Sequence, residues 1–153
     1  HPVPMSKLMR MADKRLYLSC SRDGTVALWD VASLKPLRTL KATAASGLAS
    51  WPMSVAHVPS LSSLVLGCGD RSLLAFECGS WDPKLFAPQG RLLMESTAMS
   101  MAQWVGRDEK TYLGLGDEVG VVAVYDAQLL LDAAAKPFAH TTRRTKAPLA
   151  RLD

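Results

Sequence analysis

The sequence predicts an all-β protein made of repeated four-stranded antiparallel sheets. Three segments share one pattern of strand, tight turn and strand, and they align without gaps: Ser19–Asp30, Leu66–Glu77 and Leu115–Asp126. Each segment ends in an aromatic residue followed by an acid, and these acids lie 47 and 49 residues apart. In the later two segments the second strand is apolar at successive positions, which indicates a sheet covered on both faces. The sequence therefore predicts stacked sheets with a fixed period.

The first repeat contains the clearest turn. Asp23-Gly24 is a strong hairpin signal, because glycine accepts the positive φ that tight turns require. We expect the four strands of this repeat at about Val3–Met9, Leu16–Ser21, Thr25–Asp30 and Pro36–Leu40. A small, flexible connection rich in alanine, serine and threonine follows over Lys41–Ser50.

The second and third repeats follow the same order with additions. In the second repeat we expect strands over Met53–Val58, Ser63–Cys68, Ser72–Glu77 and Arg91–Glu95, with an extended loop over Cys78–Gly90. Trp81-Asp82 falls in that loop, because it follows no apolar strand and precedes Pro83.

The third repeat is expected to contain a short helix after its hairpin. Its strands are expected over Ala98–Val105, Thr111–Leu115, Val121–Asp126 and Phe138–His140. Asp126–Lys136 is rich in leucine and alanine, so we expect a helix with Asp126 near its cap, stopped before Pro137.

The first repeat resembles the WD40 family, in which a Trp-Asp dipeptide such as Trp29-Asp30 closes each blade of a propeller. The resemblance implies a partial WD40 β-propeller of three four-stranded antiparallel blades plus the first strand of a fourth. The corresponding units are 1–50, 51–97, 98–146 and 147–153. Closed propellers have about 4–8 blades, so we expect the chain to be a piece of a longer protein. We expect the outer faces of the first and third repeats to expose apolar side chains, with candidates among Val26, Leu28, Val122 and Val124.

The resemblance also implies a structural network within a blade. In the family, a histidine, a serine, an aspartate and the tryptophan are often joined by hydrogen bonds that brace the blade without doing chemistry. Here the matching residues are His1, Ser19, Asp23 and Trp29. We expect Trp29 to be largely buried with its indole N–H near Ser19 or His1, and Asp23 to face His1. The second repeat keeps Asp70 but has Phe76 in place of tryptophan, and the third has Val119 and Tyr125 at these two positions.

The sequence offers no positive sign of an enzyme. His1, His57 and His140 have no acid or nucleophile at motif spacing, and no nucleophile elbow, phosphate loop or zinc pattern occurs. We therefore expect no catalytic residue, metal or cofactor. The three cysteines lack metal-ligand spacing, which favours free buried thiols in a reducing compartment.

A protein-interaction scaffold is the function that we expect, because loops on a rigid framework are common binding sites. The chain has 153 residues, a net charge of +4 and no membrane-spanning stretch of apolar residues. A basic segment near its end leaves an alternative open, a propeller that binds phospholipid or nucleic acid. The candidate residues are Arg143, Arg144, Lys146 and Arg151, which could equally form a solvated loop.

A narrower resemblance concerns the middle of the chain. Trp51, Met53-Ser54-Val55, Pro59 and Leu66–Leu73 are similar to one subgroup of WD-repeat proteins, as are Ala98–Trp104 and the later Leu-Gly-Leu-Gly-Asp. Members of that subgroup combine propellers with EF-hands, and many are thought to be in cilia and flagella. This implies a cytoplasmic protein, with a cilium or flagellum as the specific location, and calcium binding only through sequence outside this chain.

Overall fold

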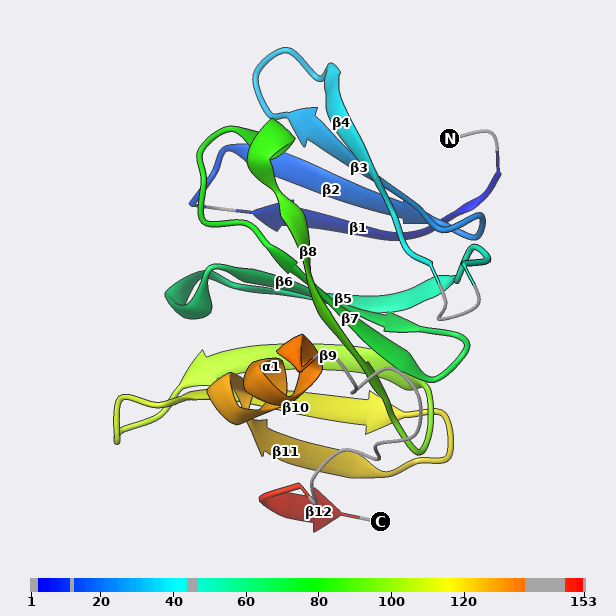
Figure 1. The fold of residues 1–153 in the computed structure, drawn as a ribbon. Helices are drawn as coiled ribbons and strands as arrows, with labels where there is room; N and C mark the ends of the chain where they lie inside the picture. The colour runs from blue at the N-terminus through cyan, green and yellow to red at the C-terminus, as the bar shows by residue number, and fades with distance from the viewer. Residues whose placement is uncertain (1–2, 12, 44–46, 137–147, 153) are drawn as a thin grey trace.

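The computed structural model describes residues 3–11, 13–43, 47–136 and 148–152 of the chain. Figure 1 shows three four-stranded antiparallel sheets stacked face to face in sequence order, with sheet one at the top. Sheet one contains β1 (Met5–Met11), β2 (Leu16–Ser21), β3 (Thr25–Asp30) and β4 (Pro36–Lys41). The expected bounds of β2 and β3 are confirmed, and the first and last strands are displaced by one or two residues.

Sheet two contains β5 (Pro52–Val58), β6 (Ser63–Cys68), β7 (Ser72–Glu77) and β8 (Ala87–Leu93). Sheet three contains β9 (Ala98–Val105), β10 (Thr111–Asp117), β11 (Val122–Asp126) and β12 (Ala150–Leu152). Within each sheet, the first three strands pair in the order of the sequence, and β5 contacts both β1 and β9. The result is an all-β, partial propeller-like fold, with one short α-helix among the residues that the structure describes.

The three hairpins turn in the same way, which confirms that the aligned segments are structural repeats. Gly24, Arg71 and Gly120 occupy the same aligned position, and each has a positive φ, of 82°, 69° and 90° respectively. An aspartate side chain accepts backbone hydrogen bonds within each turn. Asp23 and Asp70 do this at the position that the sequence predicts, at 2.9 Å from Thr25 N and 3.1 Å from Ser72 N.

Two apolar layers hold the stack together. We call the side of a sheet that faces the next sheet in sequence its forward face, and the other side its backward face. The forward face of sheet one packs on the backward face of sheet two, through buried residues that include Leu18, Val26, Leu28, Leu66 and Phe76. The forward face of sheet two packs on sheet three through Val65, Leu73, Ala75, Leu113 and Leu115.

β7 lies in the middle of the stack and is covered on both sides. Leu74 and Phe76 contribute to the first apolar layer, whereas Leu73 and Ala75 contribute to the second. All four side chains are buried. The interpretation as a strand covered on both faces is therefore confirmed for β7. It does not hold for β11, where Val122 is 46% exposed.

The helix α1 (Ala127–Ala135) closes the second apolar layer. The side chain of Asp126 accepts hydrogen bonds from the backbone of Gln128 and Leu129, so the expected cap is confirmed. In Figure 1 the helix lies beside β8 and in front of β10, and both strands contact it. Contact is close at Gly90, where an added Cβ would lie 2.3 Å from the carbonyl oxygen of Ala134.

The structure corrects two strand assignments. β8 begins at Ala87, whereas the sequence predicted a start at Arg91. The strand can include Pro88 because it is an edge strand of its sheet, where a residue without a backbone N–H is tolerated. The segment 147–153 was expected to start a fourth sheet. Instead, Ala150–Leu152 pairs antiparallel with β11 and forms the outer strand of sheet three. The strand expected at 138–140 lies outside the described residues.

The three cysteines are free and buried, as the sequence predicts. Cys20, Cys68 and Cys78 all belong to the layer between sheets one and two. Burial raises the pKa of Cys20 to about 12, of Cys68 to about 11 and of Cys78 to about 12. All three are therefore neutral thiols that pack as small apolar side chains.

Candidate functional site

The predicted network of the first repeat is present in part. Trp29 Nε1 donates a 2.8 Å hydrogen bond to the Ser19 hydroxyl, diagonally across β2 and β3. Asp23 instead accepts from the Ser21 hydroxyl and from Thr25 N within the turn. These bonds, led by that from Ser21, lower the pKa of Asp23 to about 2. His1 lies outside the described residues.

Asp70 and Asp117 support the other two hairpins. Asp70 accepts from both the backbone and the hydroxyl of Ser72. Burial acts to raise the pKa of Asp70, but hydrogen bonds, led by the Ser72 hydroxyl, outweigh it and lower the pKa. In the third turn Asp117 accepts from Val119 N and Val121 N, at 3.0 and 2.9 Å. Asp117 was not among the residues predicted from the sequence, although an acid two positions before the aligned Val119 was a visible signal.

The backward face of sheet one is apolar and uncovered by the described chain. A groove of about 580 Å³ runs along it, lined by Met5, Leu8, Tyr17, Ser19, Trp29 and Leu34. Leu8 is 64% exposed and Leu34 is 68% exposed. Trp29 was expected to be largely buried, but it is only partly buried, because this groove leaves one side of its ring open.

The forward face of sheet three is the second apolar surface at an end of the stack. Val122 is 46% exposed there and Val124 is partly exposed. Trp104 and Tyr112 stack with ring centroids 5.9 Å apart, across the pairing of β9 with β10. Val26 and Leu28, which were expected on an exposed face of the first repeat, are fully buried. They lie on its forward face, against sheet two.

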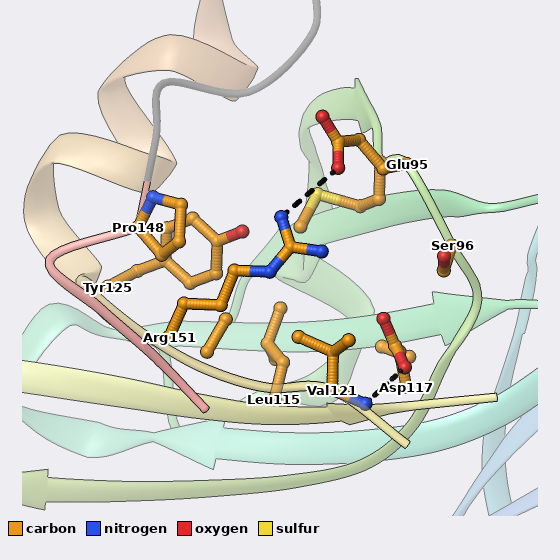
Figure 2. A pocket seen from close by; sticks show the side chains of 11 residues that line it. Glu95, Ser96, Leu115, Asp117, Val121, Tyr125, Pro148 and Arg151 are labelled. Carbon is orange, nitrogen blue, oxygen red and sulfur yellow. Dashed lines mark hydrogen bonds and ion pairs between the residues drawn. The ribbon is translucent and has the colours of Figure 1, made fainter. Parts of the chain in front are cut away.

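Arg151 is the one member of the predicted basic patch within the described residues; Arg143, Arg144 and Lys146 lie outside them. Figure 2 shows Arg151 among the residues of a pocket, with Glu95 and Tyr125 close to it. The pocket has a volume of about 140 Å³ and lies between the segment after β8 and sheet three. The guanidinium of Arg151 lies 3.6 Å from the Glu95 carboxylate. Asp117, Ser96 and Tyr125 line the same pocket. The structure therefore places Arg151 in a mixed-charge pocket.

A groove of about 500 Å³, with both apolar and polar residues in its lining, lies along β1, β5 and β9, the first strand of each sheet. His57 Nε2 lies 3.5 Å from the Asp13 carboxylate there, an approach that sequence spacing did not reveal. Burial lowers the pKa of His57, and Asp13 opposes that effect. Within the described ranges, no group of three His, Cys, Asp or Glu side chains is placed to hold a metal ion.

No protein-family model matches the chain, and no curated protein matches it. The part of the chain that the structure describes contains no helix long and apolar enough to cross a membrane.

Proposed function

We propose that this chain belongs to a WD40-type propeller and serves as a non-enzymatic scaffold that binds proteins. Three repeated hairpins with one turn geometry support this proposal, as does the bond between Trp29 and Ser19. A ciliary or axonemal assembly is the more specific form of the proposal, and it rests on the sequence motifs around Trp51 and Trp104 alone.

The observation that carries the proposal is the apolar groove on the backward face of sheet one. Large exposed apolar patches mark contact surfaces, because burying them releases free energy in proportion to their area. Trp29 and Tyr17 add aromatic side chains, which are enriched at the centres of protein interfaces. The groove is therefore suited to an apolar protein surface.

The packing between sheets within the chain indicates which kind of partner surface would fit the groove. Three residues that line the groove have aligned counterparts in sheet two: Tyr17, Ser19 and Trp29 align with Leu64, Leu66 and Phe76. The three counterparts lie on the backward face of sheet two, which sheet one covers. Val122 and Val124 on sheet three align with Val26 and Leu28, which cover sheet two. The partner that fits the groove is thus a sheet with such a forward face, which a second copy of this chain carries on its sheet three.

Sedimentation of the 153-residue chain tests this proposal. We expect the chain to associate as its concentration rises into the micromolar range, and Leu8→Glu to return it to a monomer, because the glutamate would be buried in the contact. Leu85→Glu is the matched control, since Leu85 is equally exposed at 64% but lies outside the groove. A monomer at every concentration, or an equal effect of both variants, would contradict the proposed contact.

A further inference from the structure

A further hollow, of about 360 Å³, lies where three segments meet: the end of β4, the strand β8 and the carboxyl end of α1. Apolar residues such as Leu74, Phe76 and Pro88 contribute to its lining. Its other lining residues include three cations, Lys41, Arg91 and Lys136, and no aspartate or glutamate. This hollow is separate from the groove on sheet one and from the pocket that contains Arg151.

Arg91 has an unused donor at this hollow. Its Nη2 donates to the carbonyl oxygen of Thr43 and lies 3.4 Å from the Thr43 hydroxyl, which fixes the guanidinium. Its Nε is buried and has no hydrogen-bond partner among the described residues. Buried N–H groups in native proteins are nearly always paired, so the arrangement calls for an acceptor that a bound molecule could supply.

The charge at the hollow is not balanced by the described chain. The ion pairs within the described residues involve none of the three cations. Lys41 Nζ donates to a neutral group, the Thr25 hydroxyl, at 2.8 Å. The carboxyl end of a helix carries only about half a negative charge, so α1 offsets a small part of three positive charges.

We propose that this hollow binds a phosphate group, free or as an ester. A guanidinium matches the geometry of phosphate oxygens and can donate two parallel hydrogen bonds, whereas the lysines act as mobile point charges around it. Arg91 would turn the guanidinium edge that carries its enclosed Nε–H toward the hollow to hold the phosphate, and Lys41 and Lys136 would neutralise the remaining charge. The hydroxyl of Thr43 and the amide of Gln89 lie in the same lining.

Titration of the ¹⁵N-labelled chain with inorganic phosphate tests the site, with sodium chloride at matched ionic strength as the reference. We expect saturable shifts of the backbone amides of Gly90, Ala134 and Thr43. Arg91→Gln should weaken binding about tenfold or more, since it removes a charge-assisted contact. Arg107→Gln is the control, because Arg107 is exposed and does not line the hollow. Shifts that do not saturate, or equal losses in both variants, overturn the proposal.

A second variant keeps the test valid if Arg91→Gln fails to fold. Lys41→Gln combined with Lys136→Gln alters two exposed side chains and should also weaken phosphate binding. Co-sedimentation with phosphatidylcholine vesicles, with and without phosphatidic acid, then separates the sources of the phosphate group. Binding to the acidic vesicles that this double variant loses indicates a lipid headgroup. Saturable binding of inorganic phosphate without vesicle binding indicates a soluble phosphate.

Discussion

Trp29 donates its indole N–H to the hydroxyl of Ser19, at 2.8 Å, and this bond joins β2 to β3 on the backward face of sheet one. Ser19 is buried, whereas the ring of Trp29 lines the open apolar groove. One tryptophan therefore has two roles, one as a brace within the sheet and one as part of the surface that we propose for binding.

We predict that Trp29→Phe destabilises the chain, because phenylalanine has no donor for the buried Ser19 hydroxyl. The net loss of one such hydrogen bond costs about 0.5–1.5 kcal/mol in the free energy of unfolding. Urea denaturation measures the change, and Trp81→Phe at an exposed loop position is the control. If the bond matters, a double-mutant cycle with Ser19→Ala gives a coupling energy above zero. No coupling would show that the tryptophan contributes through packing alone.

The two glycines at the same turn position differ in their surroundings, which gives a paired prediction. Both have a positive φ, which costs an alanine about 1–2 kcal/mol. A Cβ at Gly24 would also lie 2.7 Å from the carbonyl oxygen of Ala42, whereas a Cβ at Gly120 would meet open space. Gly24→Ala should therefore lower the urea midpoint clearly more than Gly120→Ala. Equal losses in the two variants would mean that the backbone near Ala42 moves away from the added methyl group without a measurable loss of stability.

Much of this fold could be predicted from the sequence, because local signals specify the hairpins. The turn at Asp23-Gly24 and the closing Trp29-Asp30 located β2 and β3. The pairing of β12 could not be predicted in this way, since a three-residue strand has little pattern of its own and pairs with whichever edge lies nearby.

The surfaces were harder to predict than the strands. Alternation separates the two faces of β3, but it does not say which face meets the next sheet, so Val26 and Leu28 were expected on the exposed side. The approach of Asp13 to His57 and the hollow lined by Lys41, Arg91 and Lys136 join residues far apart in sequence. The spacing of these residues along the sequence does not predict such contacts.

The free energy of unfolding should depend on pH through the carboxyl group of Asp23. The pKa of this carboxyl is about 2 in the folded chain, below the ordinary value of 3.8, so the unfolded chain takes up the proton first as pH falls. The ionised Asp23 carboxyl therefore stabilises the folded chain fully above about pH 4, and this stabilisation is lost as the pH falls from about 4 to about 2. Asp23→Asn should flatten the fall of the unfolding free energy in that window, measured by urea denaturation. Ser21→Ala removes the main donor and should flatten it as well; an unchanged slope in both variants would contradict this assignment.

The mode of association gives the last prediction. If the forward face of sheet three packs on the backward face of sheet one, the contact joins two different surfaces. Leu8→Glu then disables one surface and Val122→Glu disables the other, so each variant alone should be monomeric. A mixture of the two retains one intact pair of surfaces, and sedimentation should detect a one-to-one complex. If Val122→Glu alone still forms dimers, sheet one packs against its own copy and the head-to-tail arrangement is wrong. If the unmutated chain associates but the mixture stays monomeric, the two end faces are not partners for each other.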